Sequence, residues 1–489
     1  MPAATEKRRM KELDASMAGN QLKMDFSAVG ERNRFSEALH GGKFILSIEA
    51  PAPEFGSSDP APTAEQLASL EDEVMRVQGM ETILALPDRG PSWRGIEHAI
   101  ELPAGNRDRH LVFLSGAGTN DNETARLIDL AASTGIKNLV AVSGNAPIGA
   151  SVRECRRESF TESTVLLERS KESGLFTGVV TNPFQYTGYS LWSQLFKLER
   201  KLGMGAEFFI TQCGWDMLKL QALAWHLNAG HEYTPHLARL MVLSPTRMER
   251  VLRGYYPGVR ISNEFRRLLE RELGYSKAQF ESAQYRRLEL QVAGCRLMGF
   301  SGVQLVGADT PARVRIISGR IRQALEEFTS FPQWLEEYNS YLGSAEMSPI
   351  PNGYSLYDRI LYRDMPTEEI PPGNDLGTPD GSNWENLMIR LRQFFFAGAD
   401  RERPGHARLL KMLLASCRGC GRCRLEEHEF VCPENCPKRL SDGPCGGVRA
   451  DGGCEVDGEE CLHVRVVRYA HLRGDLPHFS AAGADTPRF

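Results

Sequence analysis

Eight of the eleven cysteines lie within one 45-residue stretch. They are Cys417, Cys420, Cys423, Cys432, Cys436, Cys445, Cys454 and Cys461. A protein core does not need thiols at this density, so the stretch indicates either metal binding or disulfides. The first twenty residues hold no apolar run, and no run of about 18 apolar residues follows, so we expect neither a signal peptide nor a membrane span. A cytoplasmic protein keeps its thiols reduced, and we therefore interpret the stretch as a metal centre.

The cysteine spacing leaves two kinds of metal centre open. Cys417-x2-Cys420-x2-Cys423 is typical of triplets that hold three irons of a cubane cluster, and a later cysteine followed by proline often supplies the fourth thiolate. Cys432 and Cys436 are both followed by proline. Four thiolates at similar spacings also form closed structural zinc sites. Eight thiolates suffice for two centres of either kind, and the tight triplet favours iron–sulfur over zinc.

A second set of polar residues follows short apolar runs earlier in the chain. Glu49 ends one run and precedes Ala-Pro-Ala-Pro. At the mouth of an apolar barrel such a carboxylate is partly desolvated, which favours its protonated form and suits it to donate a proton. Gln212 ends another run and offers an amide donor and acceptor to a ligand. The alternatives are a solvated charge at the rim for Glu49 and a helix cap for Gln212.

Five further positions are weaker candidates. His110 begins an apolar run and is either a ligand contact or a buried histidine. Gly144 and Asn145 follow a run, and the glycine allows a planar ligand or phosphate to approach the backbone. Arg200 and Lys201 close a helix, where two cations are also favoured by the helix dipole alone.

The elements that position these residues alternate between apolar runs and amphipathic stretches. The runs are predicted strands at 44–48, 82–86, 111–114, 139–142, 177–181, 208–211, 239–243 and 303–306. They lack alternation, as strands buried on both faces of a parallel sheet do. Thr63 and Gln66 form a predicted capping box for a helix between two runs. Eight such units predict an α/β fold, a (β/α)8 TIM-type barrel. A doubly wound sheet is the alternative, but no Gly-x-Gly-x-x-Gly follows an early strand.

The chain divides by composition into five segments. We predict an N-terminal segment (1–39), the barrel (40–330), a Pro-, Gly- and Asp-rich linker arm (331–405), a cysteine-rich module (406–475) and a tail (476–489). Short helices are expected at 387–396 and 407–415. With 41% apolar residues, 25% charged residues and a net charge of −5, the chain has the composition of a soluble protein and none of the basic character that nucleic-acid binding requires.

The barrel segment resembles the flavin-dependent methylenetetrahydrofolate reductases over about residues 40–330. The resemblance rests on Phe-x-x-Ser-x-Glu49, His110-Leu, Leu139-Val-Ala-Val-Ser-Gly-Asn145, Leu198-Glu-Arg-Lys201 and Gly205-Ala-Glu-Phe-Phe-Ile-Thr-Gln212, in that order. The cysteine stretch is more specific. Cys436-Pro-Lys-x-Leu-x-x-Gly-Pro-Cys-Gly-Gly447, followed by Cys454 and Cys461, is similar to the cysteine-rich module at the C-terminal region of such reductases. Here the two segments are fused.

The resemblance implies a flavin, FAD or FMN, at the carboxyl face of the barrel. It would be reduced by NAD(P)H or another donor and would pass hydride to 5,10-methylenetetrahydrofolate, giving 5-methyltetrahydrofolate in one-carbon metabolism. Glu49 would be the general acid and Gln212 would hold the pterin. The implied flavin-binding residues are His110, Gly144, Asn145, Asn182, Arg200 and Lys201. A redox partner protein and a homo-oligomer are further expectations.

Three positions depart from the family pattern. The family usually has aspartate where this chain has Asn145, and an apolar segment with proline where Arg239-Leu-Met-Val-Leu-Ser-Pro245 stands. Asn182-Pro183 replaces an aromatic residue before the proline. These changes leave two alternatives open: a folate-binding methyl-transfer or demethylation protein, and a non-catalytic partner subunit that binds metal.

Overall fold

The structure is a computed structural model that describes residues 32–53, 60–342, 345–357, 373–379, 381–397, 407–421 and 423–476. The chain divides into two compact units, Met1–Asn33 and Arg34–Phe489. The second unit holds both the barrel and the cysteine-rich stretch, and all that follows concerns it. Among the helices of the described residues, none has both the length and the apolar character needed to cross a membrane.

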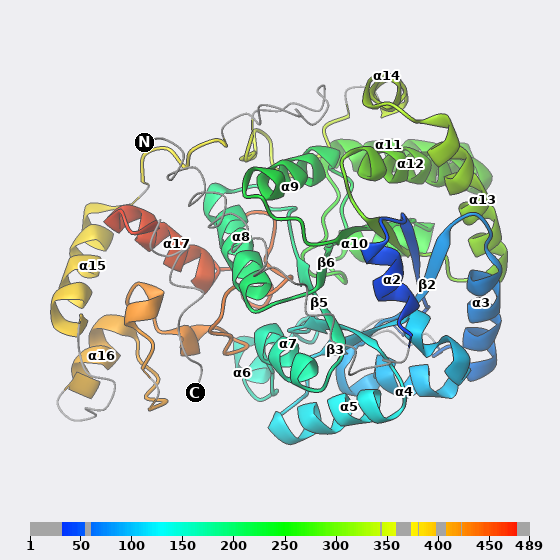
Figure 1. The fold of residues 1–489 in the computed structure, drawn as a ribbon. Helices are drawn as coiled ribbons and strands as arrows, with labels where there is room; N and C mark the ends of the chain where they lie inside the picture. The colour runs from blue at the N-terminus through cyan, green and yellow to red at the C-terminus, as the bar shows by residue number, and fades with distance from the viewer. Residues whose placement is uncertain are drawn as a thin grey trace, which may run out of the picture. The chain divides into compact units, whose positions relative to one another are not determined.

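Eight parallel strands close into a barrel in chain order, with β1 paired to both β2 and β8 (Figure 1). The strands are β1 (Ile45–Glu49), β2 (Glu81–Leu86), β3 (His110–Ser115), β4 (Asn138–Val142), β5 (Phe176–Thr181), β6 (Phe208–Thr211), β7 (His236–Met241) and β8 (Gly302–Val306). The predicted barrel is therefore confirmed. Seven strands lie within one residue of their predicted bounds, because buried parallel strands are continuous apolar runs.

The seventh strand departs most from its prediction, since it begins at His236 and ends at Met241 rather than spanning 239–243. Val242 and Leu243 are apolar and buried, yet they lie beyond the strand. The loops at the mouth are also packed, so apolar character alone does not mark where this strand ends.

Helices surround the strands and connect one to the next (Figure 1). They include α3 (Ala64–Arg76), α4 (Gly95–Glu101), α5 (Asp121–Ser133), α7 (Ser163–Glu172), α8 (Gly188–Gly203), α9 (Met217–Ala229), α10 (Pro245–Leu252), α11 (Asn263–Tyr275), α12 (Lys277–Leu297), α13 (Pro311–Glu327) and α14 (Phe331–Leu342). The predicted capping box of α3 is present, with Thr63 and Gln66 exchanging hydrogen bonds. Polar caps of this kind satisfy the first amides of a helix and fix where it begins.

The amino end of the barrel is packed with aromatic rings. Helix α2 (Arg34–His40) brings Phe35 against Phe176 and Phe208, the first residues of β5 and β6, with ring centroids 6.0 and 5.1 Å away. These rings belong to one buried apolar cluster with the first residues of β1. The interior is filled at this end, so ligand access is left to the carboxyl ends of the strands.

The C-terminal part packs directly on the barrel. It contains α15 (Asn383–Phe396), α16 (Ala407–Ala415) and α17 (Leu462–Arg473), and α17 lies against α8 (Figure 1). The helix predicted at 407–415 has those bounds. The helix predicted at 387–396 begins four residues earlier, because Ser382 and Glu385 form a capping box that the prediction missed.

Two mid-helix glycines provide a test of barrel packing. At Gly294 of α12 an added Cβ would lie 2.4 Å from Trp334 Cζ2, and that indole is fixed by donating to Leu290 O at 2.7 Å. At Gly319 of α13 an added Cβ would meet nothing within 4 Å. We expect Gly294→Ala to destabilise the protein by roughly 1–3 kcal/mol through overpacking. Gly319→Ala should stabilise it by about 0.5–1 kcal/mol through helix propensity. Urea unfolding measures both, and equal effects would contradict the packing described.

Candidate active site at the barrel mouth

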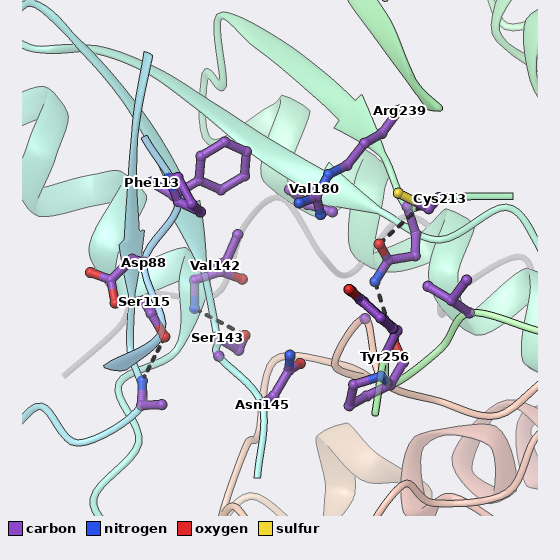
Figure 2. A pocket seen from close by; sticks show the side chains of 18 of the residues that line it. Asp88, Phe113, Ser115, Val142, Ser143, Asn145, Val180, Cys213, Arg239 and Tyr256 are labelled. Carbon is purple, nitrogen blue, oxygen red and sulfur yellow. Dashed lines mark hydrogen bonds between the residues drawn. The ribbon is translucent and has the colours of Figure 1, made fainter. Parts of the chain in front are cut away.

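A pocket opens at the carboxyl ends of the strands and is lined by residues from the barrel and from the cysteine-rich stretch (Figure 2). It encloses about 1280 Å³ of space not filled by atoms, part of it open to solvent. Of the predicted site residues, Glu49, Gly144, Asn145, Lys201 and Gln212 line it. This is the face at which (β/α)8 barrels carry their active sites.

Glu49 ends β1 and is 3% exposed. One carboxylate oxygen accepts a hydrogen bond from Arg89 Nη2 at 3.4 Å. The other accepts from Gln304 Nε2 at 2.8 Å and from Arg239 Nη2. Burial favours the neutral acid, whereas two guanidinium groups and an amide donor stabilise the carboxylate. The expected burial is present, and the ion pairs were not predicted.

Arg239 lies on β7, at the position where the sequence departs from the reductase pattern. Its guanidinium carbon is 5.6 Å from the centroid of the Phe113 ring, in addition to its contact with Glu49. Burial alone would lower the pKa of Arg239, but the charge and hydrogen bond of Glu49, together with Cys213 and Tyr256, outweigh burial and the pKa is raised. The arginine is therefore a permanent cation inside the pocket.

Asp88 is a second carboxylate of the pocket lining, and sequence reasoning missed it. It follows β2 by two residues; Oδ1 accepts from Gly90 N at 2.7 Å and from Arg94 Nη1 at 3.3 Å. Burial raises its pKa to about 7, with Arg94 opposing the shift. The available signal was position, since Asp88 stands just past a strand end as Glu49 does.

The pocket lining also contains two lysines. Lys197 and Lys201 of α8 both line it, with Lys201 Nζ donating to Val180 O at 2.7 Å. Burial, assisted by Lys197, lowers the pKa of Lys201 well below its ordinary value. Arg200 does not line the pocket and pairs instead with Asp442 at 3.2 Å. Residues four apart share a helix face and adjacent residues do not, so Lys197 rather than Arg200 accompanies Lys201.

Gln212 follows β6 and its amide is held by backbone groups. Oε1 accepts from Cys213 N at 3.0 Å and Nε2 donates to Pro257 O at 3.4 Å. Gly144 has φ +79°, and an added Cβ would lie 2.4 Å from Ser115 Oγ. The glycine is thus required by the packing of two neighbouring strand ends, and it places Asn145 at the rim of the pocket (Figure 2).

Besides Arg200, two further predicted cofactor-binding residues do not line the pocket. His110 is the first residue of β3, at the opposite end of the barrel, where its Nε2 lies 2.6 Å from Glu71 Oε1 and both side chains are fully buried. Asn182 is fully buried, and its amide donates to the carbonyl oxygens of Gly446 and Gly258 at 3.0 and 3.4 Å. The expectation for Asn182 rested on the resemblance to the reductases, but its side chain holds two loops together.

The cysteines of the C-terminal stretch are free thiols that gather in two groups. Burial raises the pKa of Cys432, with nearby Cys417 and Cys420 adding to the shift. Burial also raises the pKa of Cys461 well above its ordinary value, and Cys445, Cys436 and Cys454 add to it. Within the described residues no group of three or more His, Cys, Asp or Glu side chains is arranged to hold a metal ion. The metal centre therefore stays a prediction.

The fold and pocket define an α/β-barrel protein with a charged ligand site at its carboxyl face. Residues 396–481 match the family model described as the methylene-tetrahydrofolate reductase C terminal, which confirms the resemblance of the cysteine-rich stretch. No curated protein matches the chain. One solved structure, an uncharacterised protein from Clostridium thermocellum that binds two copies of 5-methyl-5,6,7,8-tetrahydrofolic acid, is 12% identical. That match covers 60% of this chain and 99% of the other, with a TM-score of 0.40.

Asp88 gives a pH-dependent contribution to stability that can be measured. A folded-state pKa of about 7 means that the folded protein binds this proton more tightly than the unfolded chain. The contribution is present at low pH and is lost as the pH rises through about 7. We expect the free energy of unfolding of the wild type, minus that of Asp88→Asn, to fall between about pH 4 and pH 7 by up to a few kcal/mol. A difference that is independent of pH would contradict this assignment.

Proposed function

We propose that the protein reduces 5,10-methylenetetrahydrofolate to 5-methyltetrahydrofolate with a flavin bound at the barrel mouth. The observation that supports this most is the shared pocket. The segment that matches the reductase C terminus contributes Pro444 and Gly446 to the same lining that holds Glu49 and Gln212. A carboxylate and a carboxamide facing one cavity suit a ring that must be protonated and held along a hydrogen-bonding edge.

The lining also suits a flavin. Lys197 and Lys201 offer amine donors to a phosphate group, whose negative charge would favour the charged form of Lys201. Ser163 Oγ is buried in the lining with no hydrogen-bond partner among the described residues. A flavin bound here would supply hydride. The neighbouring Asn145 is neutral where an aspartate would repel an anionic reduced ring. NAD(P)H or a redox partner protein is the proposed source of electrons.

Glu49 is the proposed proton donor, and the arginines set a condition on that role. A carboxylate must bind a proton before it can donate one, and Arg89 and Arg239 both favour the ionised state. Catalysis thus requires that ligand binding weaken at least one of these contacts. The ring edge and the glutamate tail of a folate both offer partners for a guanidinium, so the bound ligand itself can compete for Arg239 or Arg89.

Glu49→Gln tests the proposal through the half-reaction that Glu49 serves. Reduced flavoprotein is mixed anaerobically with methylenetetrahydrofolate, and flavin reoxidation is followed by absorbance. We expect a loss of at least about 100-fold in reoxidation rate, because an amide cannot replace the general acid. Reduction of the flavin by dithionite should be unchanged. Glu73→Gln, in a surface ion pair with Arg315, is the matched control. Reoxidation at the wild-type rate in Glu49→Gln would overturn the assigned role.

A folate-binding methyl-transfer or demethylation protein is the second candidate. It is favoured by the ion pairs that hold Glu49 as a carboxylate, since such a protein needs no acid there. Arg239→Met separates the two candidates. If Glu49 is the acid, Arg239→Met removes one of the contacts that ligand binding has to weaken, and flavin reoxidation by methylenetetrahydrofolate should become faster. Absence of flavin in anaerobically purified protein would favour the second candidate.

The cysteine-rich stretch is proposed to bind metal, as an iron–sulfur cluster or as zinc. The donor set fits either metal, because thiolates are the preferred ligands of both. Cys436, Cys445, Cys454 and Cys461 form the more buried group and Cys417, Cys420, Cys423 and Cys432 the more exposed one. Elemental analysis of the purified protein distinguishes iron from zinc, and chelation followed by thermal unfolding reports whether the metal supports the fold.

A further inference from the structure

The cysteine-rich stretch reaches the pocket through one loop, 443–447. Pro444 and Gly446 of this loop line the cavity together with Gln212 and with Pro257 of the loop after α10. The loop also contains Cys445, which belongs with Cys436, Cys454 and Cys461 to one set of neighbouring cysteines. This set is therefore joined to the pocket wall through the loop.

The backbone of this loop is held by a series of buried side chains from one part of the barrel. Lys197 Nζ donates to Gly443 O and Gln194 Nε2 to Cys445 O, both at 3.0 Å. Asn182 Nδ2 donates to Gly446 O at 3.0 Å, and Gln185 Nε2 to Val448 O at 3.3 Å. The four donors are 0–4% exposed and all lie between β5 and the end of α8. Such bonds between buried groups fix the loop, because breaking one leaves a donor and an acceptor unsatisfied.

Asn182 connects this loop to a second one. The same amide donates to Gly258 O at 3.4 Å, and at Gly258, which has φ +77°, an added Cβ would lie 2.1 Å from Gly446 O. The 255–259 and 443–447 loops therefore touch, with Asn182 beneath both. The pocket lining continues from this contact along the first of these loops, with Tyr255, Tyr256 and Pro257 (Figure 2 labels Tyr256).

Gly446 is the point at which the loop faces Gln212. A Cβ added here would have Gln212 Nε2 at 3.9 Å as its one neighbour within 4 Å, and the backbone angle is one that other residues adopt. A side chain at 446 would thus enter the cavity beside the carboxamide without disturbing the fold. The missing side chain leaves this space free.

We propose that the 443–447 loop is a specificity-determining wall of the barrel site, and that Gly446 keeps open the space in which a flat ring lies beside Gln212. The proposal rests on the proposed function for the identity of that ring, a reduced pterin. The cysteine-rich module is then part of the binding site, and the barrel alone does not form it.

Substitution at Gly446 tests the wall with 5-methyltetrahydrofolate as the probe. Binding is measured by calorimetry for the wild type, Gly446→Ala and Gly446→Leu. We expect affinity to fall in that order, by roughly tenfold or more for leucine, because the side chain fills the ring space. Thermal unfolding should be unchanged. Gly274→Leu on α11, where an added Cβ meets nothing within 4 Å, is the control and should bind as the wild type does. If Gly446→Leu and the wild type bind 5-methyltetrahydrofolate with equal affinity, the 443–447 loop is not a wall of the ligand site. That result would leave the proposed function intact.

A second measurement needs no ligand. Amide hydrogen exchange is compared for peptides covering 255–259 and 443–450. Asn182→Ala should speed exchange in both, because it releases both loops, whereas Gln185→Ala removes only the bond to Val448 and should affect 443–450 alone. If the wild type binds no reduced folate, the proposed function fails. The exchange comparison then tests by itself whether the 443–447 loop is held in place as a wall of the pocket. Unchanged amide hydrogen exchange in Asn182→Ala would then contradict the proposed role of the 443–447 loop.

Discussion

The structure depends on the parallel closure of eight strands with one end filled. Because each strand runs in the same direction, all eight carboxyl ends meet at one face, and Phe35 with Phe176 and Phe208 fills the other. Side chains that stand hundreds of residues apart are brought together by this constraint alone. Glu49 of β1 accepts from Gln304 of β8 across the seam at which the barrel closes. Polar residues at or just after the strand ends, such as Glu49, Asp88 and Gln212, are thereby brought to one pocket.

Charged side chains are unevenly distributed over this face of the barrel. Glu49 and Asp88 are both buried carboxylates, but they are treated differently by their surroundings. Glu49 has two arginines and an amide donor on its oxygens, whereas Asp88 has one arginine and a pKa raised to about 7. Two buried carboxylates with such different partners can serve different roles in one site. Lys197 and Lys201 complete the lining with two amine donors.

The fold and part of the site were predictable from the sequence for physical reasons. Strand positions followed from unbroken apolar runs, and Glu49, Gly144, Asn145, Lys201 and Gln212 lie where strand ends or a helix face put them. His110 was expected at the flavin site, but a histidine that begins a strand lies at the amino end of the barrel. The sequence pattern alone does not show that its partner there is Glu71. Lys197 was missed, although it stands four residues before Lys201 and therefore shares a helix face with it. Asp88 was missed although its position just past a strand end was available. The contact of Arg239 with Glu49 required knowledge of how the closed barrel places β7 and β1.

The contact between barrel and cysteine-rich stretch could not be predicted, and it changes how the fusion is understood. Asn182, Gln185, Gln194 and Lys197 are polar side chains buried in the barrel, and each donates to a backbone carbonyl of the 443–448 segment. Without that segment the barrel would present these donors to an open surface, and the pocket would lack one wall. The barrel sequence thus already contains the groups that receive the module. It follows that the two segments line one pocket, and that Cys445 lies in the chain between two of its lining residues, Pro444 and Gly446.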